Sequence, residues 1–183
     1  MKLVILDANS LGGQLDLSVF ENFGELMVYG FTSPEEVAMR IQDAEVIITN
    51  KVTLGEHNLS EAKELKLICI TGTGTNNVDK VYTLSRGIIV SNVVNYSTEN
   101  VVQHTFALLL YLLEHLPFYD EYVTSGGYVE DKTYGHFKQS YHELNGKIWG
   151  IIGLGNIGKR VAQVAEAFGC KVQYYSTSGK NVD

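Results

Sequence analysis

The sequence has few cysteines, a deficit of basic residues and no long apolar run. Cys69 and Cys170 are its two cysteines among 183 residues, and each lies in an apolar strand-like segment. We expect both to be buried, reduced thiols rather than parts of a disulfide framework. The formal net charge of −7 disfavours nucleic acid or an anionic membrane surface as the main partner. Any anion that binds must therefore be held by local donors.

No apolar segment has the length of a membrane span. The most apolar stretch, residues 106–113, is well short of the roughly 20 residues that a span requires. The apolar run before Asp7 is likewise shorter than the roughly 7–15 residues of a signal sequence. The sequence therefore predicts a soluble, cytoplasmic protein that does not act at a membrane.

The first half of the chain alternates β-rich runs with helical segments, which predicts an α/β fold with a mostly parallel sheet. Ser33, Pro34 and Glu36 have the spacing of a capping box that begins a helix. Further helices are expected over 60–64 and 77–86. Together these elements predict a flavodoxin-like domain. Its expected strands are Leu3–Leu6, Leu26–Tyr29, Val46–Thr49, Leu67–Ile70 and Ile88–Val90.

A long helix follows, from Ser97 or Thr98 to Pro117. Its apolar residues occupy more than one face, so we expect it to pack between domains or between subunits. His104, on this largely apolar helix, is expected to have a packing role. Residues 118–144 are expected to form an irregular connector.

Gly153, Gly155 and Gly158 form the pattern G-x-G-x-x-G near the end of the chain. A buried-strand run precedes the pattern, apolar residues at helical spacing follow it, and a second strand is expected after Gly169. This context favours a dinucleotide-binding loop over a glycine turn without a ligand. The first glycine allows the tight turn, the second lets the backbone approach a pyrophosphate, and the third lets helix and strand pack closely.

The helix after the glycine loop should hold the phosphates by its first N–H groups. Asn156 and Ile157, which begin that helix, are therefore candidate cofactor-binding residues together with the three glycines. This arrangement predicts NAD or NADP as the cofactor.

Ser176 stands where dinucleotide-binding domains usually carry an acid, about 20 residues beyond the loop. An acid would accept hydrogen bonds from the ribose of NAD and repel the 2′-phosphate of NADP. Ser176 lacks that repulsion, and Thr177, Ser178 and Lys180 place hydroxyls and a cation nearby. We expect NADP to be used at least as readily as NAD. The alternative is that Ser176 is a weak NAD ligand.

A second glycine-rich stretch, "TGTGTNN" at residues 71–77, lies between a predicted strand and a predicted helix. Ligands of open parallel sheets gather beyond the carboxyl ends of the strands. The N–H groups of Thr73 and Gly74 could hold a substrate carboxylate there. Lys51, which follows another strand, could add a positive charge to this site. An equally good interpretation is that Lys51 is a solvent-exposed lysine in a turn.

Three sequence blocks, in this order, resemble the D-isomer-specific 2-hydroxyacid dehydrogenases, a family that includes glycerate, D-lactate and phosphoglycerate dehydrogenases. They are "LKLICITGTGTNNVDKVYTLSRGIIVSN", "STENVVQHTFALLLYLL" and "ELNGKIWGIIGLGNIGKRVAQVAEAFGCKV". The second block departs from the family, since Val102-Gln103-His104 replaces the usual Ala-Glu-His.

The resemblance implies an NAD(P)-dependent oxidoreductase of small 2-hydroxy or 2-keto acids, with glycerate and hydroxypyruvate slightly favoured. It also implies a homodimer and places Thr73 near the cofactor as well as the substrate. Residues 1–97 would be the first part of a split substrate domain. Residues 98–183 would hold the interdomain helix, the connector and the first βαβ of an incomplete Rossmann cofactor domain. The chain would then be a truncated N-terminal portion.

The catalytic Arg, Glu and His of the family come later in its chain order and match no position here. Each of the three arginines has a structural interpretation, and the five histidines show no metal-binding spacing. We therefore expect the isolated chain to be inactive. A non-catalytic module that senses nucleotides or binds a partner is the alternative. A phosphoacceptor receiver is disfavoured because the third strand ends in "IITNK", without an aspartate.

Overall fold

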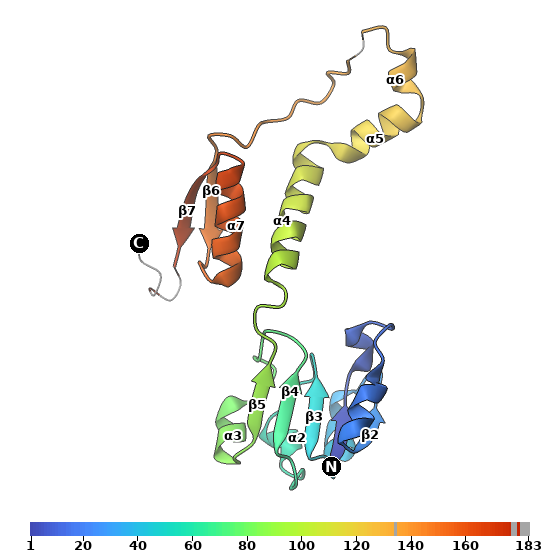
Figure 1. Cartoon of the computed structure of the whole chain (residues 1–183), viewed down its shortest axis with the longest axis vertical. Coiled ribbons are helices and arrows are strands. Elements are labelled where there is room, and N and C mark those ends of the chain that lie inside the picture. The colour runs from blue at the N-terminus through green and yellow to red at the C-terminus, as the bar shows by residue number, and fades with distance from the viewer. Residues whose placement is uncertain (134, 177–178, 180–183) are drawn as a thin grey trace. The chain divides into compact units, whose positions relative to one another are not determined.

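The structure is a computed structural model that describes residues 1–133, 135–176 and 179. The chain divides into two compact units, Met1–Val94 and Asn95–Asp183 (Figure 1). Strands and helices alternate in both units, and every strand pair in the described residues is parallel. This confirms the predicted α/β class.

The first unit is built on a five-stranded sheet with the order β2-β1-β3-β4-β5 (Figure 1). The three inner strands are the most buried, and all four residues of β3 are buried. The predicted strands are confirmed to within two residues. The observed strands are β1 Lys2–Ile5, β2 Glu25–Val28, β3 Val46–Thr49, β4 Leu67–Ile70 and β5 Ile89–Asn92.

Short helical elements connect these strands. The expected helix at Ser33 is present as η3 (Pro34–Glu36) continuing into α1 (Val37–Ile41), with the Glu36 carboxylate accepting the Ser33 N–H at 3.0 Å. Two further turns, η1 (Ala8–Leu11) and η2 (Leu17–Phe23), precede β2.

Two helix predictions in this unit were wrong in position. The helix expected over 60–64 is α2 (Glu56–Leu59), and Ser60 ends it. The helix expected from residue 77 is α3 (Lys80–Ser85), because Asp79 is its N-cap and accepts the N–H groups of Val81 and Tyr82 at 3.0 Å each.

The core of the first unit lies on both faces of the sheet. One face packs against α1, α2 and α3 through a large cluster that includes Val4, Ile47 and Ile68. The other face, with Leu3, Ile5, Val46 and Ile48, is covered by apolar residues of η1 and η2. Cys69 is only half-buried on this second face, so full burial was a wrong expectation for that thiol.

The second unit contains a βαβ element: β6 (Ile148–Ile152), α7 (Asn156–Ala167) and β7 (Lys171–Tyr175). The long helix α4 (Thr98–Leu113) packs on it, with Val102 and Phe106 in one cluster with α7. The Phe106 ring stacks on the single tryptophan, Trp149, with a centroid distance of 4.9 Å. α4 therefore buries a face that a lone βαβ would leave in water.

The expected helix from residue 97 to 117 is broken in the structure. His115 has a left-handed backbone (φ 50°), and α5 (Leu116–Thr124) starts directly after it with Pro117 in its first turn. α6 (Gly127–Glu130) follows, so the predicted irregular connector is partly helical. His104 is exposed on α4, which contradicts its expected packing role.

No single helix of the described residues is both long and apolar enough to cross a bilayer. Only when taken together do α4 and α5 have the length and composition of a membrane span, and the two helices are bent by 62° relative to each other.

Candidate functional site

The glycine loop between β6 and α7 has the geometry that the sequence predicted for two of its glycines. Gly153 has a φ of 93°, a left-handed conformation that favours glycine, and its N–H donates to the Tyr175 carbonyl at 2.9 Å. A Cβ at Gly158 would lie 2.3 Å from the Gly153 carbonyl oxygen, so no side chain fits there. The loop therefore needs glycine at both positions to hold the helix against the strand.

Gly155 is different, since nothing lies within 4 Å of a Cβ built on it. It is the N-cap of α7, with extended backbone (φ −79°, ψ −167°) that any residue could adopt. Neither packing nor conformation thus requires glycine here. Open space beside the first turn of a 12-residue helix is what a phosphate group would use.

The side chains at the start of α7 differ in their contacts and exposure. The Asn156 Nδ2 donates to Asn95 Oδ1 at 2.5 Å, which ties the helix start to the segment that precedes α4. Ile157 is 38% exposed. Arg160, one turn on, pairs with Glu99 at 2.9 Å, which agrees with its expected structural role.

Ser176 comes directly after β7, and its Oγ is shielded from solvent. This hydroxyl has no hydrogen-bond partner among the described residues. Thr177, Ser178 and Lys180, which the sequence placed beside a 2′-phosphate, lie outside the described residues.

In the first unit, the parallel strands bring their loops to one edge of the sheet. The loop after β4 is fixed to the end of β5, because Thr73 Oγ1 donates to the Val93 carbonyl at 3.1 Å and Asn92 Nδ2 donates to the Thr73 carbonyl at 2.7 Å. The N–H groups of Thr73 and Gly74 enter no hydrogen bond within the described part of the chain. They are thus available to an anion such as a carboxylate.

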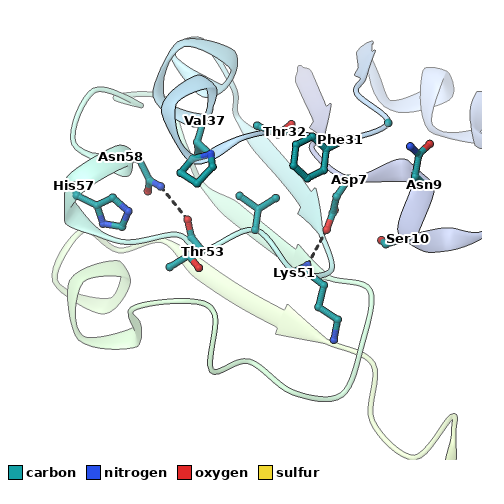
Figure 2. Close-up of a pocket in the computed structure, with 13 residues that line it drawn as sticks. Asp7, Asn9, Ser10, Phe31, Thr32, Val37, Lys51, Thr53, His57 and Asn58 are labelled. Atoms are coloured by element: carbon teal, nitrogen blue, oxygen red, sulfur yellow. Dashed lines mark hydrogen bonds between the residues drawn. The ribbon is translucent and has the colours of Figure 1, made fainter.

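The loop after β3 carries Lys51 and is anchored by Asp7 (Figure 2). The Asp7 carboxylate accepts the N–H of Lys51 at 2.7 Å and that of Asn50 at 2.9 and 3.0 Å. Asn77 Nδ2 joins this loop to the loop after β4, donating to the Val52 carbonyl at 3.0 Å. The structure thus connects the two loops in which the sequence placed Lys51 and Thr73. The sequence missed the anchoring role of Asp7, a buried aspartate at a strand end.

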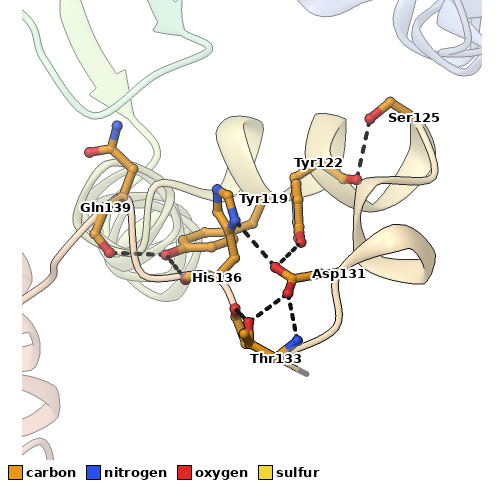
Figure 3. A network of polar contacts seen from close by, with 8 residues as sticks. Tyr119, Tyr122, Ser125, Asp131, Thr133, His136 and Gln139 are labelled. Carbon is orange, nitrogen blue, oxygen red and sulfur yellow. Dashed lines mark hydrogen bonds and ion pairs between the residues drawn. The ribbon is translucent and has the colours of Figure 1, made fainter.

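The largest pKa shifts lie in a polar network between α5 and the segment after α6 (Figure 3). Hydrogen bonds from Thr133 and from the Tyr122 hydroxyl lower the pKa of Asp131 to about 2. Burial, together with the hydrogen bond to Asp131, raises the pKa of Tyr122 to about 12. The His136 ring stacks on Tyr122 at 3.9 Å. Because the Asp131 carboxylate is hydrogen-bonded to Tyr122 and Thr133, the network holds this segment together.

Among the described residues no group of three His, Cys, Asp or Glu side chains could hold a metal ion. Burial raises the pKa of the Cys69 thiol, which makes it a poor nucleophile. Backbone donors remain available in the loop at 71–77, where the N–H groups of Thr73 and Gly74 enter no hydrogen bond within the described residues.

Residues 4–179 match the model of the D-isomer specific 2-hydroxyacid dehydrogenase catalytic domain. The chain belongs to this family. It is 37% identical, over 174 residues, to a glycerate dehydrogenase from Methylorubrum extorquens, an alignment that covers 93% of this chain and 54% of the relative.

Two solved structures of the same architecture contain nicotinamide cofactors. A D-lactate dehydrogenase from Aquifex aeolicus, complexed with NAD and lactic acid, is 29% identical with a TM-score of 0.77 over 97% of this chain and 51% of its own. An acyclic imino acid reductase in complex with NADPH and D-arginine is 25% identical, with a TM-score of 0.81 over 100% of this chain and 58% of its own. The chain therefore spans about half the length of these relatives.

Proposed function

We propose that this chain is the N-terminal part of a nicotinamide-dependent oxidoreductase that interconverts small 2-hydroxy and 2-keto acids. The observation that carries the proposal is the glycine loop, where Gly153 and Gly158 are required by conformation and packing while Gly155 faces open space. Family membership supports the same function. A bound nicotinamide cofactor supplies or accepts the hydride.

The cofactor pyrophosphate would lie against Gly155 and the first N–H groups of α7. This is supported by the helix dipole and by the unfilled space at Gly155. Asn156 and Ile157 would position the loop rather than supply charge. The cofactor would therefore be held by backbone donors, which suits a chain of net charge −7.

At the first unit's loop edge, the N–H groups of Thr73 and Gly74 would hold the substrate carboxylate, and Thr73 would also approach the nicotinamide. Lys51 would add a positive charge from the neighbouring loop. The proton transfer needs a general acid or base. We assign it, with the substrate-binding Arg and its Glu partner, to residues outside this chain. The 37% identity to a glycerate dehydrogenase favours glycerate and hydroxypyruvate as substrates.

We further propose that the enzyme uses NADP at least as readily as NAD. Ser176 brings no negative charge to the end of β7, so a 2′-phosphate would meet no repulsion from that position. Relatives of both kinds exist, since one solved structure is complexed with NADPH and another with NAD.

We also propose that the complete protein is a homodimer in the cytoplasm. α4 exposes apolar side chains on the faces that do not pack on α7, and a second subunit would remove them from water. Leu112 is 70% exposed. Other exposed apolar residues of α4 are Val101, Leu108 and Tyr111.

The test is a nicotinamide absorbance assay with hydroxypyruvate, glyoxylate and pyruvate, run on this chain and on the complete protein. The complete protein should turn over at least one of these acids. The 183-residue chain should show no enzyme-like turnover, because the missing acid or base alone is worth about 10² to 10⁴ in rate. A complete protein that binds cofactor but turns over none of the acids would favour a nucleotide-sensing module instead.

A further inference from the structure

A cavity of about 520 Å³ opens in the first unit, where the loops after β1, β2 and β3 meet the start of α2 (Figure 2). All of its lining residues belong to Met1–Val94. The volume falls in the range of about 300–1,000 Å³ that is usual for small-molecule sites. Apart from Lys51, none of the lining residues takes part in the proposed dehydrogenase chemistry.

The floor of the cavity is buried, and its polar atoms are already used. The two Asp7 oxygens hold the Asn50–Lys51 backbone. Thr32 Oγ1 donates to the Leu6 carbonyl at 2.5 Å, and Asn58 joins backbone groups of its own loop, accepting from the Gly55 N–H at 3.0 Å. A polar ligand group placed on this floor would therefore be left without a partner, which is costly.

The walls are apolar and include one large aromatic ring. Phe31 is 71% exposed at the mouth of the cavity, and Val37 is fully buried behind it. Pro34 and Val52 line the space between them. Floor and walls together favour a ligand with an aromatic or branched apolar body.

The rim of the cavity is polar, in contrast to the apolar walls. Its polar side chains are exposed, and none of them enters a hydrogen bond within the described residues. Lys51 brings a positive charge and His57 a ring nitrogen, while both oxygens of Asp7, the one carboxylate of the lining, already accept backbone N–H groups. A negative ligand group at the rim would meet the Lys51 ammonium and side-chain donors, while the Asp7 carboxylate lies on the floor with both oxygens already hydrogen-bonded. The rim consists of Asn9, Ser10, Lys51, Thr53 and His57.

We propose that this cavity is a second binding site, which takes a small carboxylate with an aromatic or branched apolar body. The body lies against Phe31, Val37 and Val52, and the carboxylate lies at the rim near Lys51 and His57. No residue of the glycine loop or of the loop at 71–77 lines the cavity. Lys51 is the one residue that this cavity shares with the proposed substrate site.

The test uses the 183-residue chain, labelled with ¹⁵N and titrated with 3-phenylpropanoate. Amide shifts should saturate at residues 30–33 and 50–58 and stay unchanged at Thr73 and Gly74. The uncharged 3-phenylpropan-1-ol should bind roughly tenfold more weakly, since it lacks the charge-assisted bonds. Failure to saturate, equal affinity of the two probes, or shifts centred on Thr73 and Gly74 would each overturn the proposal.

Two variants check the location. Thr53→Trp should block the mouth and abolish the titration, while Val81→Trp, at an 82% exposed position on α3, should leave it unchanged. Phe31→Ala removes an exposed wall with little risk to folding and should weaken binding several-fold. Circular dichroism confirms that each variant is folded. Unchanged binding in both Thr53→Trp and Phe31→Ala would contradict the assignment.

Discussion

Gly158 packs so closely on Gly153 that a Cβ at Gly158 would lie 2.3 Å from the Gly153 carbonyl oxygen. The clash is with backbone, which cannot move aside as the end of a side chain can. Gly158 is therefore a packing requirement of the loop, whereas Gly155 is the position that leaves room for a ligand.

Gly158→Ala should destabilise the second unit, because the helix must shift away from the strand. We expect a loss of about 1–3 kcal/mol, the usual cost of overpacking. Urea unfolding followed by Trp149 fluorescence measures it, since that ring is stacked on Phe106 inside the unit. Gly150→Ala is the matched control, because a Cβ there meets nothing within 4 Å. Equal stability of the two variants would contradict the packing role.

Asp7→Asn should destabilise the first unit. The carboxylate accepts N–H groups from Asn50 and Lys51 through both oxygens, and an amide would turn an NH₂ group toward one of these donors. The expected loss is about 1–3 kcal/mol. Far-ultraviolet circular dichroism during urea unfolding should show it, with the Trp149 fluorescence transition unchanged.

The control for Asp7 is Asp43→Asn, because Asp43 is 73% exposed and its pair with Lys2 is a surface contact. That change should cost about 0–1 kcal/mol. If Asp7→Asn lowers the free energy of unfolding no more than this control does, the carboxylate does not anchor the loop.

Acid should loosen the packing of the segment after α6 on α5 in a defined pH window. The pKa of Asp131 is lowered from 3.8 to about 2, so its contribution to stability is present above about pH 4 and is lost as the pH falls toward 2. The protection of amides over residues 116–133 against hydrogen exchange, relative to an unfolded chain at the same pH, should fall across that window. Asp131→Asn should remove the pH dependence.

Asp120→Asn is the control for Asp131, since the Asp120 side chain enters no hydrogen bond within the described residues. It should leave the exchange profile as in the original chain. A profile that is flat between pH 4 and 2 in the original chain would show that Asp131 does not stabilise the segment.

Ser176→Asp should shift cofactor preference toward NAD. The new carboxylate would accept hydrogen bonds from the ribose diol and repel a 2′-phosphate. The change should be a few-fold, because a single charge interaction at a partly exposed residue is worth about 0–1 kcal/mol. The measurement is kcat/KM for NADH and NADPH on the complete protein. A strong preference for NADH that the aspartate leaves unaltered would refute the phosphate-pocket interpretation.

The elements that could be predicted from the sequence are those that a short run of neighbouring residues specifies. Strands such as Val46–Thr49 are runs of buried β-branched residues, and the glycine loop combines a conformational signal at Gly153 with a packing signal at Gly158. The α2 helix was misplaced because it has only four residues and begins at Gly55, where no apolar periodicity can develop. Pro117 was read as a stop although proline is equally suited to the first turn of a helix.

Other features depend on contacts between distant residues. The segment after α5 is held by Asp131 and His136 meeting Tyr122, and no short sequence pattern encodes that arrangement. His104 was expected to pack because of its apolar neighbours, yet the packed face of α4 runs through Val102 and Phe106. The cavity of the first unit arises from three loops and a helix start, so its lining could not be assembled from the sequence.

A titration of the 183-residue chain with NADH, followed by nicotinamide fluorescence, tests the central claim most directly. The account predicts saturable binding that falls about tenfold or more in Gly155→Val, where the side chain would fill the space left for the pyrophosphate. Gly150→Val, on the preceding strand, should bind as the original chain does. Absence of binding, or equal binding by Gly155→Val and Gly150→Val, would contradict the claim that this loop holds a dinucleotide.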